Sequence, residues 1–315
     1  MKASIGSLNL GQLARSVAGL VLATLLYGCS VTSHDVEPAT LGKVSSWEAL
    51  LAVADKPGPI VFEKHLAAHW AVDLSGLVNL DNPVAVAAGL KDKTEPIELY
   101  TYSLQHPRYG TFLVDSGISE RFRRPGENHD IAWIIRQVMD TSALRIEHTT
   151  REIASNLQTP VEGVFLTHIH MDHIMGLSDL PAGVPVYVGP GDTEMKSMEY
   201  LVTQGTTDRL LGAGTHLREW QFGGGDVIDI FGDASVFAIH SPGHTPGSTA
   251  YLVRSTDGPQ LITGDACHTA WGWRHGVEPG TFSYDQQRSV ASLMRLIKLV
   301  RAHPGIAVHP GHQSL

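Results

Sequence analysis

The sequence predicts a mixed α/β fold of the α+β type, in which stacked β-sheets are accompanied by helices. Four short apolar, β-prone segments each run into a glycine-containing loop that carries a histidine or an aspartate, at His168, His244, Asp265 and His312. A β-rich scaffold assembles a site where several strand ends meet at one edge of its sheets. Hydrophobic residues make up 43% of the 315 residues and charged residues 17%, which is typical of a globular protein and excludes disordered and fibrous classes.

The net charge of −9 argues against a nucleic-acid ligand. Residues 1–28 carry Lys2 and Arg15 and no acids, so the rest of the chain is more acidic still. An acidic body repels phosphate backbones, and no basic stripe interrupts it. We therefore expect a small molecule, not DNA or RNA, as the binding partner. The sequence admits a homodimer but does not require one.

The first 28 residues are expected to be a targeting segment and not part of the fold. Val17 to Leu26 is an apolar core too short to span a bilayer, and it is followed by Tyr27-Gly28-Cys29. This arrangement resembles a bacterial lipoprotein signal. The resemblance implies cleavage before Cys29, acyl chains on that cysteine, and a membrane anchor facing the periplasm. Ser30 implies routing to the outer membrane. The alternative is an ordinary cleaved signal peptide with an incidental cysteine.

Cysteine usage excludes a disulfide framework. The chain has two cysteines, and Cys267 has no partner once Cys29 is taken by lipid. Beside Asp265, Cys267 is expected to be a small buried packing residue.

The segments after the signal are expected to lead into one large domain. Residues 29–45 are polar and mixed and predict a tether, and Ser46 to Ala54 predicts a short helix with Ser45 or Ser46 as its cap. Residues 61–90 show no dependable periodicity of hydrophobic residues, and we expect a helical segment in which His65 and His69 share a face. Residues 46–95 would then be a lead-in that packs on a domain spanning residues 96–315.

The pattern sharpens from Ile97 onward. Residues 97–104 and 111–117 predict a β-hairpin that ends at Asp115, and residues 131–139 and 149–157 predict helices. Residues 161–166 and 184–188 predict strands, and Asp192 is expected to cap a helix that runs to about Val202.

The last third of the chain predicts further strands and one long helix. Residues 220–230 and 235–239 resemble a β-meander with Gly223 to Gly225 as its turn, and residues 250–253, 261–263 and 306–308 predict three more strands. Residues 284–301 predict an amphipathic helix capped by Asp285, with a buried stripe of Val290, Leu293, Met294, Ile297 and Val300.

The densest group of reactive side chains follows the strand at residues 161–166. His168 and His170 are spaced i, i+2, which places both imidazoles on one face of an extended backbone, and Asp172 and His173 follow at once. Neutral imidazole and carboxylate are natural ligands of zinc and similar divalent ions. A set of pH-sensitive surface histidines is the alternative, but four such groups at one strand end favour a metal site.

These residues resemble the signature of the metallo-β-lactamase superfamily of hydrolases, over about residues 97–315. The matching segments are His168-x-His170-x-Asp172-His173, Gly243-His244-Thr245-Pro246-Gly247, Thr263-Gly264-Asp265 and Pro310-Gly311-His312. The resemblance implies an αββα sandwich of two mixed β-sheets flanked by helices. It also implies two metal ions, one held by His168, His170 and His244, the other by Asp172, His173 and His312, with Asp265 as the bridge. Asp115 would orient the site without binding metal.

The resemblance also implies a chemistry. Two divalent ions about 3.5–4 Å apart, zinc by preference and iron or manganese as alternatives, would hold water as hydroxide and polarise a carbonyl. Asp172 would pass a proton to the leaving group. We therefore expect hydrolysis of an ester, lactone, amide or thioester bond.

Within the superfamily, the sequence is most similar to the N-acyl homoserine lactonase branch, through Leu104-Gln105-His106-Pro107 and the order of the later motifs. One departure is His268, at a position where that branch carries a tyrosine that holds the lactone carbonyl. His268 is therefore expected either to replace the tyrosine as a catalytic donor or to mark another substrate. β-Lactamases, glyoxalase II-like thioesterases and persulfide dioxygenases are alternatives, as is a lipoprotein that keeps the fold only for binding. His309 is an alternative to His312 as the closing ligand.

Overall fold

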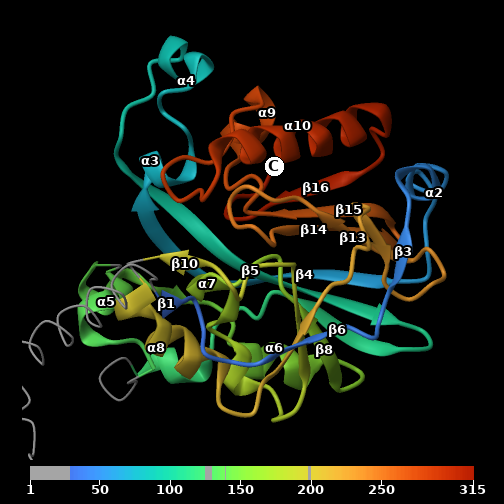
Figure 1. Ribbon diagram of the computed structural model, residues 1–315, viewed down its shortest axis with the longest axis horizontal. Helices are drawn as coiled ribbons and strands as arrows, with labels where there is room; N and C mark the ends of the chain where they lie inside the picture. The colour runs from blue at the N-terminus through green and yellow to red at the C-terminus, as the bar shows by residue number, and fades with distance from the viewer. Residues whose placement is uncertain (1–28, 125–129, 139, 198–199) are drawn as a thin grey trace, which may run out of the picture.

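The computed structural model describes residues 29–124, 130–138, 140–197 and 200–315, and it shows two mixed β-sheets packed face to face. Helices α9 (Ala270–His275) and α10 (Gln286–Ala302) lie outside the smaller sheet, and α6 (Thr150–Asn156) and α8 (Tyr200–Leu211) lie outside the larger one (Figure 1). This confirms the predicted class of two mixed sheets flanked by helices. The targeting segment falls outside the described residues.

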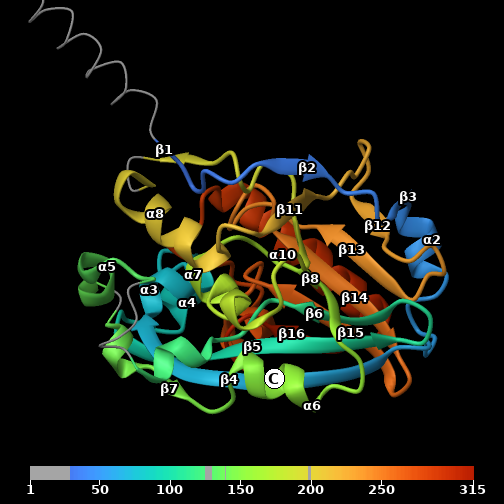
Figure 2. The same cartoon turned by 90° about the horizontal axis from the view of Figure 1, so that it is seen from below.

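The larger sheet has eight strands in the order β2-β11-β9-β8-β6-β5-β4-β7. Its strands are β2 (Val36–Pro38), β4 (Val61–Asp73), β5 (Thr94–His106), β6 (Gly110–Val114), β7 (Arg145–Ile146), β8 (Val161–Phe165), β9 (Pro185–Val188) and β11 (His216–Glu219). The long strands β4 and β5 lie side by side in Figure 2. The predicted hairpin is confirmed, because β5 and β6 pair antiparallel from Tyr102 opposite Val114 to His106 opposite Gly110. β6, β8, β9 and β11 then follow as parallel neighbours.

The smaller sheet has six strands in the order β16-β15-β14-β13-β12-β3. They are β3 (Lys43–Ser45), β12 (Val227–Asp229), β13 (Val236–His240), β14 (Thr249–Ser255), β15 (Gly258–Gly264) and β16 (Ala307–Pro310), and the strands predicted near residues 250, 261 and 306 are confirmed. β15 and β16 run parallel, so the segments that follow them, with Asp265 and His312, leave the sheet at the same edge.

The elements not yet described are all short. They are β1 (Cys29–Ser30) paired with β10 (Lys196–Ser197), the α-helices α2 (Trp47–Leu51), α3 (Leu74–Leu77), α4 (Pro83–Ala87), α5 (Trp133–Val138) and α7 (Met171–Ile174), and three single turns of 3₁₀-helix, η1 (Glu120–Arg123), η2 (Thr141–Ala143) and η3 (Leu177–Asp179). The predicted caps are present where Ser46 accepts from the Ala49 N–H and Asp285 from the Arg288 N–H. Within the described residues, no helix is long and apolar enough to cross a membrane.

Aromatic side chains fill the space between the sheets and fix the strand that leads to the histidine cluster. The Phe165 ring at the end of β8 stacks on Tyr251 of β14, with ring centroids 5.9 Å apart. The buried Trp220 indole donates to the Tyr251 hydroxyl at 3.2 Å, and that hydroxyl donates to the Leu166 carbonyl at 2.7 Å. Stacked rings and satisfied polar atoms therefore hold the backbone two residues before His168.

Two expectations for the N-terminal part of the fold were wrong. Residues 30–45 are not a tether, because β2 pairs with β11 and β3 pairs with β12. Residues 61–73 are not helical but form β4, which pairs with β5 along its whole length. A register shift between Leu66 and Ala68 leaves Ala67 and Ala68 both fully buried, so the alternation typical of a strand is broken in the sequence.

Three further expectations need correction. No helix begins at Asp192, because this side chain is fully buried and α8 begins at Tyr200. The segment from residue 220 to 230 is not one strand of a meander, since β11 and β12 lie in different sheets with the glycine turn between them. In α10, Val290 and Met294 are exposed, and the buried face is formed by Ser289, Ser292, Leu293, Leu296, Ile297 and Leu299.

Candidate metal centre

The predicted ligands meet at one edge of the two sheets. His168 and His170 follow β8, and α7 begins directly after His170 and carries Asp172 and His173. The other ligands come from the smaller sheet: His244 lies between β13 and β14, and Asp265 and His312 follow β15 and β16. These side chains form two groups whose potential ligand atoms lie within 4.8 Å of one another, His168–His170–His244 and Asp172–His173–Asp265–His312.

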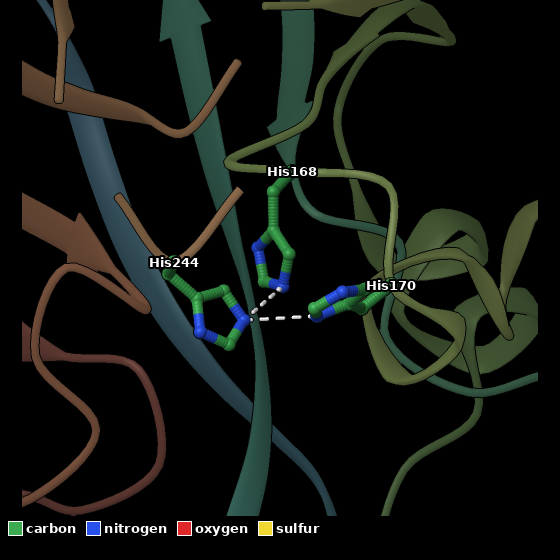
Figure 3. Close-up of side chains that lie close together, drawn as sticks. All are labelled: His168, His170 and His244. Atoms are coloured by element: carbon green, nitrogen blue, oxygen red, sulfur yellow. Dashed lines mark hydrogen bonds between the residues drawn. The ribbon is translucent and has the colours of Figure 1, made fainter. Parts of the chain in front are cut away.

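The first group is a cluster of three neutral imidazoles. The His244 Nε2 lies 2.9 Å from the His170 Nδ1 and 3.2 Å from the His168 Nε2 (Figure 3). Burial lowers the pKa of His170 to about 4 and holds the pKa values of His168 and His244 well below their usual range. All three rings are therefore neutral at pH 7, the form in which imidazole binds a metal.

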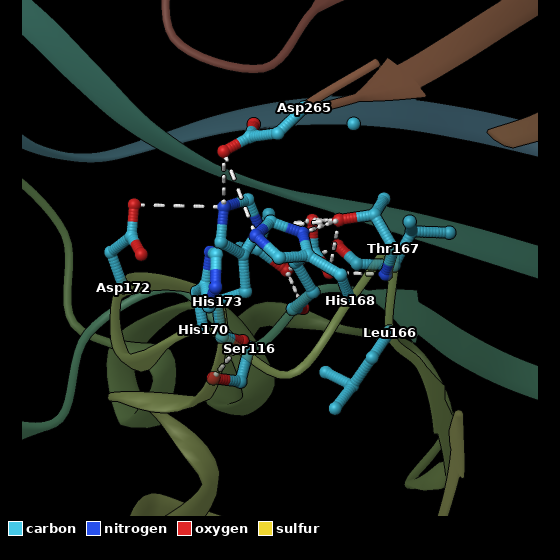
Figure 4. Close-up of polar contacts among 12 residues, drawn as sticks. Ser116, Leu166, Thr167, His168, His170, Asp172, His173 and Asp265 are labelled. Carbon is cyan, nitrogen blue, oxygen red and sulfur yellow. Dashed lines mark hydrogen bonds and ion pairs between the residues drawn. The ribbon is translucent and has the colours of Figure 1, made fainter. Parts of the chain in front are cut away.

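The second group surrounds the carboxylate of Asp265. Figure 4 shows this carboxylate facing His173 and His168, with Asp172 on the far side of His173. The Asp265 Oδ2 lies 3.1–3.6 Å from five ring nitrogens, the Nε2 atoms of His268, His312, His173, His244 and His168. The Asp172 Oδ2 lies 3.3 Å from the His312 Nε2 and 3.6 Å from the His173 Nε2.

Hydrogen bonds behind the rings decide which nitrogen faces the site. The His173 Nδ1 lies 2.8 Å from the Asp115 Oδ2, and the His312 Nδ1 lies 3.1 Å from the Glu98 carbonyl oxygen. Carboxylates and carbonyls only accept, so each Nδ1 carries a proton and each Nε2 is the nitrogen that faces the site. Burial lowers the pKa of both rings, but the neighbouring carboxylates outweigh it and raise both pKa values, so a metal ion would displace a proton from each Nε2 when it binds. Each ring thus turns toward the site the nitrogen that a metal ion would bind.

Asp115 is held behind the ligands, as its resemblance to an orienting aspartate implies. It accepts from the Thr167 N–H at 2.7 Å and belongs to neither candidate metal group. Its backbone adopts a left-handed conformation with φ of 55°, which aspartate tolerates better than most residues. The turn after β6 therefore points this carboxylate at the base of the histidine cluster.

The donor set fits divalent cations. The His173 Nε2 and the Asp265 Oδ1 are both buried and have no hydrogen-bond partner, although buried polar atoms normally have one. Burial alone would raise the pKa of Asp265, but the neighbouring imidazoles, His312 first, hold it well below its usual range. An ionised carboxylate surrounded by imidazole nitrogens is a donor set that borderline divalent ions bind.

The structure separates the two candidates for the closing ligand. His312 belongs to the second group, whereas the His309 Nε2 lies 2.9 Å from the Gln260 Oε1 and its ring packs on Phe62. Burial lowers the pKa of His309 to about 4. Cys267 is buried, as expected for a packing residue.

Asp192 is a site residue that the sequence analysis misassigned. Its Oδ1 accepts from the Gly247 N–H at 2.7 Å and its Oδ2 from the Ile169 N–H at 3.2 Å, and burial raises its pKa to about 7. The carboxylate therefore joins the His168–His170 loop to the loop after His244. The signal was present, because Val184 to Val188 is one more strand that runs into a glycine-containing loop ending in an acid.

A comparison with known protein families covers the residues that carry these motifs. A sequence profile described as the metallo-beta-lactamase superfamily matches residues 103–312. An N-acyl homoserine lactonase, AttM of Azorhizobium caulinodans, is 26% identical over 67% of this chain and 80% of its own length.

Solved structures share the fold at low sequence identity. One is an N-acyl homoserine lactone hydrolase with the product N-hexanoyl-L-homoserine bound at its catalytic metal centre; the TM-score is 0.55 at 18% identity, covering 81% of this chain and 93% of that one. Another is AidC, described as a dizinc quorum-quenching lactonase, with a TM-score of 0.50 at 12% identity over 82% of this chain and 88% of that one. At these identities the likeness concerns the fold alone.

We predict that Asp192→Asn weakens metal binding at the three-histidine group. The amide places an N–H₂ against one of the two backbone N–H groups, so one of the two ligand loops loses its hydrogen bond. Losing such an outer contact typically lowers metal affinity by about 10–100-fold. Competition with a chelator measures this change.

Asp179→Asn is the matched control. The Asp179 carboxylate is also buried and accepts from two backbone N–H groups, of Glu120 and Arg151, but neither of these neighbours a ligand. We expect this control to cost stability while leaving metal affinity unchanged. Equal metal affinity in wild type and Asp192→Asn would refute the positioning role.

Proposed function

This chain belongs to the metallo-β-lactamase superfamily, and we propose that it is a two-metal hydrolase that opens the lactone ring of N-acyl homoserine lactones or related esters. The observation that carries the proposal is the convergence of seven imidazole and carboxylate side chains, Asp265 among them, at one edge of the two sheets. AttM and the two solved structures described above are lactonases, which favours a lactone over the other carbonyl substrates of the superfamily.

Zinc is the proposed metal. Imidazole and carboxylate donors suit zinc, with iron and manganese as alternatives, and a structure of similar fold is named as a dizinc enzyme. When bound, a pair of divalent ions supplies a water of lowered pKa and polarises the substrate carbonyl. The first ion would be held by His168, His170 and His244, and the second by Asp172, His173 and His312, with Asp265 shared.

Asp172 is the proposed proton carrier. Its side chain is 17% exposed, against 4% for Asp265, so it is the ligand carboxylate nearer to the open side of the site. Ring opening breaks the bond between the carbonyl carbon and the ring oxygen, and that oxygen needs a proton to leave as an alcohol. Asp172 stands beside His173 and His312, where it can take a proton from the attacking water and deliver it to the leaving oxygen, while buried Asp265 stays ionised.

We further propose that Cys29 carries a lipid anchor that holds the enzyme at the outer membrane, facing the periplasm. The lipoprotein-like sequence ahead of Cys29 supports this. The fold begins at once, since β1 starts at Cys29 and Val31 is buried. An anchor on this residue would therefore hold the domain close to the bilayer, without a spacer.

Purified protein tests the proposed substrate class. Metal-replete protein should hydrolyse N-acyl homoserine lactones in preference to a chromogenic β-lactam or a glutathione thioester, as measured by product formation under matched conditions. Asp172→Asn should lower kcat by about 10²–10⁴-fold, because general acid catalysis contributes that much. His309→Gln, which changes a half-buried histidine outside the ligand groups, should keep activity. Activity on the β-lactam alone would contradict the lactonase proposal, and turnover of no substrate would favour a binding protein.

Cell fractionation tests the proposed lipid anchor at Cys29. Cys29→Ala should move the protein from the membrane to the soluble fraction of cells, because the acylated thiol is removed. Ser30→Ala is the control and should leave the protein in the membrane fraction. An unchanged distribution of Cys29→Ala between the fractions would show that no lipid is attached there.

A further inference from the structure

We propose that His268 is an eighth ligand of the metal pair, whose Nε2 binds an ion beside Asp265; this inference rests on the two-metal site proposed above. The sequence alone left two roles open for His268, a hydrogen-bond donor to the substrate carbonyl or a marker of another substrate. The geometry points instead to a lone pair directed at the metals.

His268 lies inside the cluster. It follows Asp265 by three residues, is 2% exposed, and precedes helix α9, which Thr269 caps. Its Nε2 lies 3.1 Å from the Asp265 Oδ2, the shortest of the five imidazole distances to that oxygen. His244, Asp265 and His268 form a third group of potential ligand atoms within 4.8 Å of one another.

The tautomer of His268 follows from its other nitrogen. The Nδ1 lies 3.0 Å from the Leu77 carbonyl oxygen, which only accepts, so Nδ1 carries the proton. In a neutral ring the Nε2 then has a lone pair, and it faces a carboxylate oxygen that also has only lone pairs. Two acceptors at 3.1 Å need a positive charge between them, which is either a metal ion or a second proton on the ring.

His173 and His312 show the same arrangement around the same oxygen. Each is bonded through Nδ1 to an acceptor behind the ring, and each points Nε2 at the Asp265 Oδ2. The His268 ring stacks nearly parallel to that of His312, at an interplanar angle of 14° and a centroid distance of 5.6 Å. His268 is therefore oriented as two proposed ligands are, and not as a group turned toward substrate.

The segment between β4 and β5, residues 74–93, holds His268 in this orientation. Leu77 ends α3 in the stretch between β4 and β5, which lies outside the residues that match the superfamily profile. Glu278, itself buried, accepts from the side chains of Asn79 and Asn82 at 2.5 and 2.9 Å. A Cβ on Gly280 would lie 1.9 Å from the Ser75 carbonyl oxygen, so the two backbones are in close contact. This segment thus provides the carbonyl that fixes the eighth ligand.

Metal binding by a variant that keeps an aromatic ring at position 268 but lacks the ring nitrogens tests the proposal. His268→Phe keeps the ring volume and removes both nitrogens, so affinity for one of the two ions should fall on the order of 10-fold or more, as measured by chelator competition. In cobalt-loaded protein the visible d–d absorption should become more intense, because the coordination number drops. His309→Gln should change neither readout. Unchanged affinity and an unchanged cobalt spectrum in His268→Phe would overturn the proposal.

A measurement on the unaltered chain covers the case in which that variant does not fold. In protein labelled with nitrogen-15 histidine and loaded with cadmium-113, scalar coupling between cadmium and the His268 Nε2 would establish the bond directly. Coupling at His173 and His312 but not at His268 would refute the eighth ligand and leave the two-metal site intact. Absence of bound cadmium and of coupling at every histidine would instead refute the proposed function.

Discussion

The structure depends on one buried carboxylate that faces a ring of imidazole nitrogens. The Asp265 Oδ2 has five ring nitrogens within 3.6 Å, and behind three of those rings an acceptor holds the proton on the far nitrogen, at His173, His268 and His312. Converging acceptors repel one another and are costly to bury without a partner. Divalent cations would convert this repulsion into coordination, and they would explain why otherwise unpartnered polar atoms gather there.

Both sheets contribute side chains to this arrangement, so the distances between the ligands depend on how the two sheets pack. The larger sheet supplies the loop after β8, and the smaller sheet supplies the segments after β13, β15 and β16. The aromatic layer around Phe165 and Tyr251 sets the separation of the sheets, and Asp192 joins loops that come from the two sheets. Side chains far from the reacting atoms therefore control the distances between the ligands.

Local patterns predicted the ligands, whereas non-local pairing decided what the sequence analysis missed. The sequence was sufficient to recognise the His168–His173 run and the His244, Asp265 and His312 loops, because each follows a strand within a few residues. β2, β3 and β4 were missed because polar edge strands resemble a linker and a bulge at Ala67 breaks the alternation. The orientation of His268 depends on Leu77, 191 positions away along the chain, and no sequence period signals such a contact.

Anomalous diffraction from crystals of the purified protein tests the two-metal centre most directly. Data collected on both sides of the zinc absorption edge should give two anomalous peaks per chain. One should lie among His168, His170 and His244, and the other among Asp172, His173 and His312, each in contact with Asp265. Crystals of protein supplied with zinc, iron and manganese that show no stoichiometric peak, or peaks only elsewhere on the chain, would contradict the account.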